Sequence, residues 1–298
     1  MKGKTIQSSL ILLLTAAVWG FAFVAQRMGM EHIGPFTFNA IRFFLGAISL
    51  LPLIRLLPDA KGTTYKPHNT RHFYLWGILT GIALFAGSSF QQIGIVYTTA
   101  GNAGFITGLY VIFVPILGLF LKHKTSPVVW FAALMAVVGM YFLSVTEDFN
   151  INYGDILVLI SAVFFAVHVL VIGHVTGMYN ALKISVVQFF TCGLMSATAA
   201  LLFETISLDG IEQALVPILY GGLVSVGVGY TLQVVGQKYA KPAPAAIILS
   251  TEAVFAVIGG VWILHETLDN RALFGCCLML AGMILAQIPF RLRKVNAS

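Results

Sequence analysis

Charged residues are scarce in this chain of 298 residues: they make up 9% of the sequence, whereas hydrophobic residues make up 58%. Ordinary soluble domains carry roughly 25% charged and 45–50% apolar residues. A soluble fold of this size would lack the polar side chains needed to cover its surface. The composition therefore excludes a soluble globular protein and indicates a chain embedded in lipid.

Cysteine is also rare, and Cys192, Cys276 and Cys277 all lie in apolar runs. They lack the paired spacings of a disulfide framework or a zinc site, so we expect them to serve helix packing. The formal charge of +6 comes from bases scattered between apolar runs, which does not favour a nucleic-acid partner.

Enzyme signatures are missing as well: the sequence has no Gly-x-Ser-x-Gly elbow, His-Glu-x-x-His pair, phosphate-binding Gly-rich loop with lysine or paired intramembrane aspartates. We therefore predict neither an enzyme nor a bound cofactor.

Long hydrophobic runs dominate what is present, and a crossing of the bilayer needs about 20 apolar residues. Ten such runs nearly exhaust the chain, which leaves no room for a sizeable soluble domain. The uncharged stretch from Phe73 to Leu121 is too long for one crossing, so we divide it at the turn-forming residues 98–102. The predicted spans are Ser8–Gln26, Phe36–Leu57, Phe73–Val96, Asn102–Leu121, Pro127–Ser144, Gly154–Gly173, Leu182–Phe203, Ala214–Lys238, Ala243–Leu264 and Ala272–Pro289.

The placement of charge tests the ten-span assignment, because lysine and arginine accumulate in cytoplasmic loops. With the N-terminus inside, only Arg27 and Arg271 fall in outer loops, and Arg42 falls within a span. Of the acids outside the spans, only Asp59 is on the inner side. We therefore predict an all-α integral membrane protein of the bacterial inner (plasma) membrane, with ten transmembrane helices and cytoplasmic N- and C-termini.

An internal repeat emerges when the sequence is compared with itself at an offset of 142 positions. The identical pairs at this offset are Gly87/Gly229, Gln91/Gln233, Gly94/Gly236, Tyr97/Tyr239, Ala103/Ala245, Phe113/Phe255, Gly118/Gly260, His123/His265 and Thr125/Thr267. Nearer the start of the chain, Arg42-Phe43-Phe44 aligns with Gln188-Phe189-Phe190 at an offset of 146.

Each half of the repeat has an odd number of spans, so the two halves enter the membrane from opposite sides. We predict inverted five-helix repeats at residues 1–148 and 149–298. This symmetry commonly supports alternating access, with substrate bound where the repeats meet.

Several short motifs carry a family resemblance. Ala17-Val18-Trp19-Gly20, Arg42-Phe43-Phe44 and Leu264-His265-Glu266-Thr267-Leu268, with Gly275 and Ala281-Gly282, resemble the EamA-type members of the drug/metabolite transporter superfamily. The resemblance covers nearly the whole chain. The sequence departs from the family pattern at two positions. Ala253 stands where many relatives have proline, and Lys124 occupies the first-half position that corresponds to Glu266.

The resemblance implies a ten-helix bundle whose central cavity handles amino acids, their derivatives or other small amphiphilic metabolites, often for efflux. We expect a monomer or weak dimer in the bilayer, with protons as the candidate coupling ion. Uptake of a vitamin or metabolite, a channel and a non-transport membrane subunit remain alternatives.

Ionisable groups inside a span are expensive and so are candidate functional residues. Arg42 could bind a substrate carboxylate, snorkel outward, or pair with helix-end carbonyls or a gating acid. Glu252 is the candidate for proton coupling, because burial near the bilayer centre favours its protonated form; the alternative is a protonated acid bonded to a neighbouring helix. His168 could take up protons or simply fill the core, and no second ligand at helical spacing predicts a metal.

Polar and aromatic stripes complete the candidate site. Ser225, Gly229, Gln233 and Gln237 recur every four residues, and Gln91 with its neighbouring glycines forms the matching stripe of the first half. Buried amides need partners, so we interpret the stripes as cavity walls, with interhelical hydrogen bonding alone as the alternative. The predicted substrate-binding residues are Trp19, Arg42, Gln91, Tyr110, His168, Tyr230 and Gln233.

Overall fold

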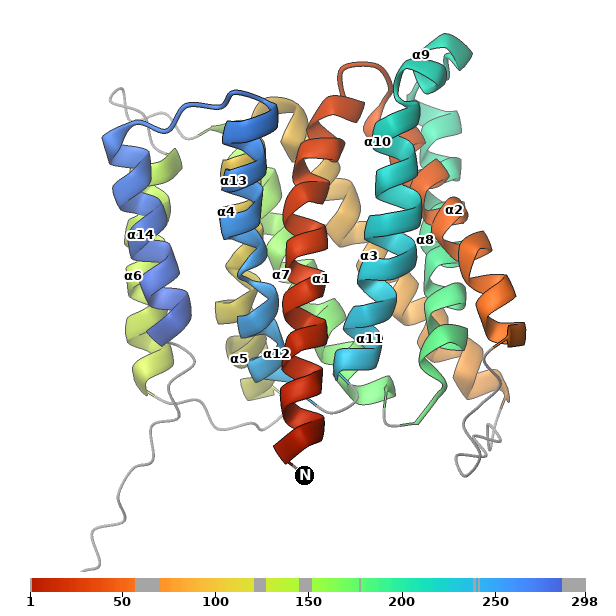
Figure 1. The fold of residues 1–298 in the computed structure, drawn as a ribbon, viewed down its shortest axis with the longest axis horizontal. Coiled ribbons are helices and arrows are strands. Elements are labelled where there is room, and N and C mark those ends of the chain that lie inside the picture. The colour runs from red at the N-terminus through yellow and green to blue at the C-terminus, as the bar shows by residue number, and fades with distance from the viewer. Residues whose placement is uncertain are drawn as a thin grey trace, which may run out of the picture.

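The computed structural model describes residues 2–56, 70–120, 127–144, 152–176, 178–237, 240 and 242–285, and the elements within these ranges are helical. Figure 1 shows upright helices that run alternately up and down in one bundle, with the N-terminus at the lower end. The helices are α1 (Lys2–Gly29), α2 (Pro35–Leu56), α3 (Thr70–Tyr97), α4 (Ala100–Gly108), α5 (Tyr110–Phe120), α6 (Pro127–Ser144), α7 (Tyr153–Val175), α8 (Ala181–Phe203), α9 (Leu208–Gln213), α10 (Leu215–Leu219), the π-helix η1 (Tyr220–Tyr230), α11 (Thr231–Gln237), α12 (Pro242–Leu249), α13 (Glu252–Ile263) and α14 (Asn270–Leu285).

Among the residues that the structure describes, seven helical stretches are long and apolar enough to cross a membrane, which confirms an all-helical membrane protein. The division at residues 98–102 is also confirmed, because α3 ends at Tyr97 and the next helix begins at Ala100. Three other predicted spans coincide with shorter apolar helices: α6 has 18 residues, α14 has 16, and the span from Ala243 to Leu264 is interrupted. The seven long stretches are Ile6–Gly29, Pro35–Arg55, Thr70–Tyr97, Ala100–Phe120, Tyr153–Val175, Ala181–Phe203 and Leu215–Gln237.

The prediction of one continuous helix from Ala243 to Leu264 is wrong, because α12 ends at Leu249 and α13 begins at Glu252. The Thr251 hydroxyl donates to the Ile248 carbonyl at 2.6 Å, and the Ala253 amide bonds three residues back, to the Ser250 carbonyl. Such local side-chain bonds compete with the helix ladder and tighten the turn. A milder break at Leu109 separates α4 from α5. The first residues after the two breaks, Tyr110 and Glu252, are counterparts at the 142-residue offset.

The helices of one half pack chiefly against helices of the other. Helix α2 packs on α8, α3 on α7 and α8, α1 on α13 and η1, α4 on α13, and α6 on α14. Figure 1 shows the α6 and α14 pair side by side at one edge of the bundle. Counterpart residues meet at the α2–α8 contact: the ring centroids of Phe43 and Phe189 are 6.2 Å apart, and those of Phe44 and Phe190 are 5.9 Å apart.

Glycines let helices of the two halves approach closely at matching points. A Cβ on Gly229 would lie 2.6 Å from Trp19 Nε1, and a Cβ on Gly87 would lie 3.1 Å from the Phe165 ring. Gly87 and Gly229 are counterparts at the 142-residue offset, and Trp19 and Phe165 are counterparts at the 146-residue offset. The repeated packing therefore supports the internal repeat. The repeat residues His123, Thr125 and Tyr239, together with Lys124, lie outside the described residues.

Candidate functional site

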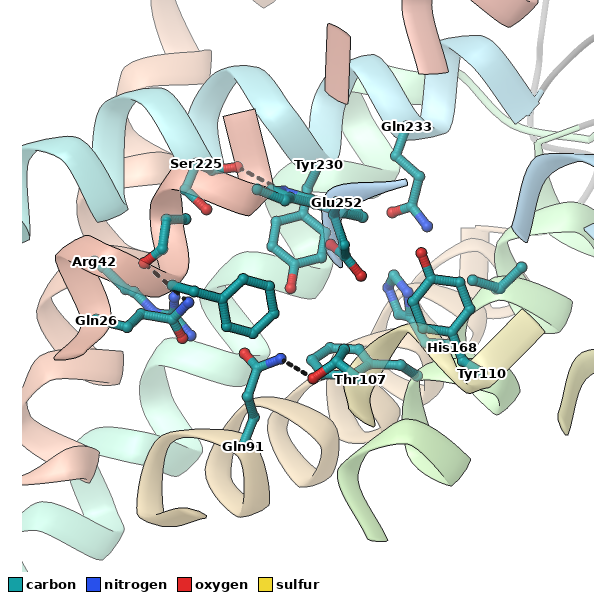
Figure 2. Close-up of a pocket in the computed structure, with 15 residues that line it drawn as sticks. Gln26, Arg42, Gln91, Thr107, Tyr110, His168, Ser225, Tyr230, Gln233 and Glu252 are labelled. Carbon is teal, nitrogen blue, oxygen red and sulfur yellow. Dashed lines mark hydrogen bonds between the residues drawn. The ribbon is translucent and has the colours of Figure 1, made fainter. Parts of the chain in front are cut away.

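All eight predicted site residues line one buried cavity between the two halves, and Figure 2 shows its polar side chains converging from both sides. The cavity measures about 30 Å³, which is room for roughly one water. The eight predicted residues are Trp19, Arg42, Gln91, Tyr110, His168, Tyr230, Gln233 and Glu252.

Arg42 lies at one end of the cavity and is 2% exposed, so outward snorkelling is wrong for this side chain. Its Nε donates to Asn39 Oδ1 at 2.9 Å, and Asn39 Nδ2 donates in turn to the Ser88 carbonyl at 3.1 Å. The guanidinium carbon lies 4.9 Å from the Phe43 ring centroid and 5.5 Å from that of Phe38. One guanidinium nitrogen, Nη2, is buried without a hydrogen-bond partner. Asn39 and the two rings therefore hold the Arg42 guanidinium in place, and its Nη2 is still able to donate a hydrogen bond.

Glu252 enters the cavity as the first residue of α13 and is 3% exposed. Its Oε1 has no hydrogen-bond partner, and the same is true of the Tyr110 hydroxyl and of Gln233 Oε1. Figure 2 shows the side chains of Glu252, Tyr110 and Gln233 grouped away from Arg42. A buried polar atom without a partner costs free energy, so this group can bind a ligand that donates hydrogen bonds.

His168 lies beside Tyr110 in the cavity wall (Figure 2). Its Nε2 lies 2.9 Å from Gln188 Oε1, and its ring meets the Tyr230 ring edge-on with centroids 6.0 Å apart. With the amide oxygen in this place, Nε2 carries the hydrogen and donates it. Gln188 is the repeat counterpart of Arg42, so the second half uses that position to orient a histidine.

The remaining predicted residues form the cavity walls. Gln91 Nε2 donates to Thr107 Oγ1 at 3.0 Å. Trp19 Nε1 donates to the Ser225 carbonyl at 3.2 Å, and the ring centroids of Trp19 and Tyr230 are 4.5 Å apart. The two rings therefore give the cavity an apolar wall, in which the indole N–H of Trp19 is already paired.

The predicted four-residue stripe is only partly on the cavity. Ser225 and Gln233 line it, whereas Gly229 packs against Trp19 and Gln237 donates to the Val169 carbonyl at 3.3 Å. The reason is the π-helix over Tyr220–Tyr230, whose wider turn breaks the α-helical period on which the stripe was based.

Four polar residues around the site were not predicted. Gln26 and Thr107 line the cavity, and Asn39 and Gln188 orient Arg42 and His168. Two signals were available: Asn39 precedes Arg42 by one helical turn, and Gln188 already aligned with Arg42 in the repeat. Gln26 is the last residue of a predicted span, where a polar side chain is expected at the membrane surface and does not indicate a cavity.

Most of the cavity lining consists of repeat counterparts. In two of these pairs only one member is a histidine or an acid: the repeat counterpart of His168 is Ala22, and that of Glu252 is Tyr110. The pair Gln91 and Gln233 is identical, whereas two unequal pairs supply the ionisable side chains of His168 and Glu252. The pairs are Trp19/Phe165, Ala22/His168, Phe23/Val169, Gln91/Gln233 and Tyr110/Glu252.

Comparison with known proteins gives a consistent result. Residues 7–145 and 152–287 each match the EamA-like transporter family. An "Uncharacterized transporter" of Archaeoglobus fulgidus is 35% identical over 291 residues, which are 96% of this chain and 87% of that protein. The "Uncharacterized transporter YoaV" of Bacillus subtilis is 24% identical, over 93% of this chain and 96% of that protein.

A solved structure titled "Crystal structure of protein" is similar to the fold with a TM-score of 0.72. It covers 94% of this chain and 96% of its own, at 16% sequence identity. At that identity the likeness extends to the fold alone.

Proposed function

The chain belongs to the EamA-like transporter family, and from this premise we propose that it exports amino acids or related amphiphilic metabolites across the bacterial inner membrane as a secondary transporter. In this proposal the ten predicted spans all cross the bilayer, the halves 1–148 and 149–298 are inverted repeats, and both termini are cytoplasmic. The alternation of helix directions in the bundle supports this topology (Figure 1).

The observation that carries the proposal is the pair of helix breaks at the cavity. Tyr110 and Glu252 each begin a helix segment after an interruption inside an apolar span, and both face the cavity. Interrupted helices at the interface of two repeats are typical of transporter binding sites, because irregular backbone is tolerated in a membrane only where it lines a cavity or is buried in protein.

The small size of the cavity supports alternating access. At about 30 Å³ it is far smaller than the roughly 300–1,000 Å³ of pockets that hold small ligands. Cargo therefore enters only when the halves move apart at one end. Because the binding site lies between the halves, such a movement opens one end while the other stays closed.

The distribution of unpaired polar atoms supports a zwitterionic cargo. Arg42 Nη2 offers a charged donor at one end, which suits a carboxylate. Glu252 Oε1 and Gln233 Oε1 offer acceptors away from Arg42, which suit an ammonium group or a hydroxyl, and Gln26 Oε1 offers a further acceptor beside Arg42 (Figure 2). Trp19 and Tyr230 supply the apolar wall between them.

The same arrangement links cargo to protons. An ammonium group binds best to ionised Glu252, so a proton on this carboxylate competes with the cargo. Competition for one site makes transport an exchange, with protons entering as cargo leaves. The other titratable or charged groups that line the cavity around Glu252 are Tyr110, Tyr230, His168 and Arg42.

The test is transport by protein reconstituted in liposomes, with and without a pH gradient. We expect a gradient to drive amino acid movement against the proton flow. Glu252→Gln is expected to abolish gradient-driven accumulation by removing the titratable group. Exchange of cargo for cargo should continue with weaker binding, because glutamine keeps an acceptor oxygen but not the charge. Transport by Glu252→Gln with an unchanged dependence on pH would remove Glu252 from the coupling role.

Glu212→Gln is the matched control for that variant, because it makes the same chemical change at an exposed residue that does not line the cavity. If no amino acid or related metabolite moves or exchanges under any gradient, the proposed export is wrong. A gradient that drives accumulation in the opposite sense would instead identify an uptake permease.

A further inference from the structure

Two glutamates join the halves at the end of the bundle opposite the N-terminus, uppermost in Figure 1. Glu204, just after α8, accepts from the backbone amides of Phe36 and Thr37 at 2.7 and 2.8 Å and from the Thr37 hydroxyl at 2.7 Å. Glu266, in the loop after α13, accepts from the amides of Ala100 and Gly101 at 2.6 and 3.0 Å. We call these contacts the two carboxylate clasps.

Both clasps have the same geometry and the same polarity. Each carboxylate takes two successive amides in the first turn of a helix, where the helix dipole favours negative charge. Both glutamates belong to the second half of the chain, and both helices that they cap, α2 and α4, belong to the first. Separation of the halves at this end would therefore break every one of these hydrogen bonds.

The local backbone is shaped to admit the carboxylates. A Cβ on Gly34 would lie 2.3 Å from Glu204 Cδ, and a Cβ on Gly260 would lie 2.3 Å from Glu266 Oε2. His265, immediately before Glu266, has a φ of 54°, which costs a non-glycine residue roughly 1–2 kcal/mol. Such a conformation persists when surrounding contacts determine it, and the Glu266 clasp is one such contact.

Two hollows, each large enough for several water molecules, adjoin the clasps. One hollow of about 420 Å³ is lined by Glu266 and Thr99, and another of about 360 Å³ is lined by Gly34 and Thr37. Glu31 lines both. The clasps are therefore at the boundary between these hollows and the packed interior that contains the central cavity.

The sequence provides no equivalent of the Glu266 clasp in the first half. The repeat counterpart of Glu266 is Lys124, which lies outside the described residues. A lysine ammonium cannot accept a hydrogen bond from a backbone amide, and its charge is unfavourable at a helix N-terminus.

We propose that Glu204 and Glu266 are gate residues, whose clasps hold the end opposite the N-terminus closed and release when cargo passes through it. This inference rests on the proposed transport function. The conformational part can be tested without any cargo, so the two can fail separately.

The first experiment measures access to the cavity. In a variant lacking Cys192, Cys276 and Cys277, a reporter Phe23→Cys is placed in the cavity wall, and a membrane-impermeant maleimide is added from the clasp side. We expect Glu204→Gln together with Glu266→Gln to raise the labelling rate about tenfold, because the charge-assisted hydrogen bonds exist only in the closed state and weakening them destabilises that state alone. Unchanged labelling in this double variant would overturn the proposal.

Asp269→Asn is the matched control, since Asp269 Oδ1 accepts from the Ala272 amide at 2.6 Å and so caps a helix of its own half. This variant removes the charge from a helix cap, as Glu→Gln does at the clasps, but it changes no contact between the halves, so we expect labelling to stay at the starting rate. An equal increase in Asp269→Asn would show that any weakened helix end admits the reagent, and would overturn the gate assignment.

A second experiment keeps the proposal testable if the double variant does not fold. Thr37→Cys and Glu204→Cys, in the same cysteine-free variant, are joined by a short reducible bis-methanethiosulfonate linker. We expect transport to stop on linking and to return on reduction. Transport that continues with the linker intact would show that α2 and α8 need not separate at this end.

Discussion

Arg42 is a buried cation with one guanidinium nitrogen left without a hydrogen-bond partner. Its environment combines a hydrogen bond from Nε to Asn39, two aromatic rings, and an unpaired Nη2 beside the cavity. Leaving one buried donor without a partner costs roughly 1–3 kcal/mol, which a ligand carboxylate would recover on binding. At the scale of single residues, the site is thus defined by what is left unsatisfied as much as by what is bonded.

Arg42→Lys tests this assignment. A lysine keeps the charge but loses the planar fork that bonds Asn39 and a carboxylate at once. We expect amino acid binding to weaken about tenfold, or about 1.4 kcal/mol, measured by calorimetry on purified protein. The amine analogue that lacks the carboxylate serves as the control ligand, and its affinity should not fall. Equal weakening for both ligands would assign Arg42 to packing.

At the scale of elements, the π-helix η1 is explained by the repeat itself. Gly81 packs on Thr191 and Gly222 packs on Leu45. Leu45 and Thr191 are repeat counterparts at the 146-residue offset, so Gly81 and Gly222 occupy equivalent places in the two halves. These two glycines are 141 positions apart, but the next equivalent pair, Gly87 and Gly229, is 142 positions apart. The second half therefore carries one residue more than α3 between these points, and an extra residue widens an α-helix into a π-helix.

Deletion of Leu223, a lipid-facing residue that is 40% exposed, should return η1 to an α-helix of the same length as its counterpart. Because the glycine contacts on either side keep their places, we expect a folded protein with a thermal unfolding midpoint close to that of the parent. Deletion of Ile82 in α3 is the control. Helix α3 lacks the inserted residue, so this deletion should shift its packing contacts out of register and lower the unfolding midpoint. Equal losses of stability would contradict the insertion.

The helices and most of the cavity could be predicted because hydrophobicity, charge and repeats are long-range patterns. The helix break at Ser250 and Thr251 could not be predicted, because serine and threonine are also common inside continuous membrane helices. The hydrogen bond from the Thr251 hydroxyl to the Ile248 carbonyl, which accompanies the break, is visible only in the structure. The π-helix escaped prediction for a related reason: a one-residue difference in the repeat is visible only once the packed pairs are known. The clasps depend on contacts far apart in sequence, such as Glu204 with Thr37.

At the scale of the whole molecule, each half depends on the other. The principal helix contacts join α2 to α8, α3 to α7, α4 to α13 and α6 to α14, so most of the packing crosses between halves. Within the described residues the core around the cavity draws on both halves, from Leu12 and Phe43 to Phe189 and Ala253. A single half would expose its polar cavity side chains to lipid, which is costly.

Expression of residues 1–148 and 149–298 as two separate chains tests this dependence. We expect the pair to assemble when made together and to recover measurable transport, while either half alone should be degraded in the membrane. Co-purification through a tag on one half, followed by transport in liposomes, gives the readout. A lone half that is stable and monodisperse would contradict an interface shared by both.

Packing across the halves also dictates an order of events during synthesis. Helices α1 to α6 leave the ribosome first but find their main partners only in α7 to α14. At roughly 5–20 residues per second, the first half waits on the order of 10–30 s for the second. Throughout that interval Arg42 and Gln91 are already in the bilayer without their cavity. We therefore expect the newly made protein to be most open to membrane proteases during this waiting period, before the second half covers these side chains.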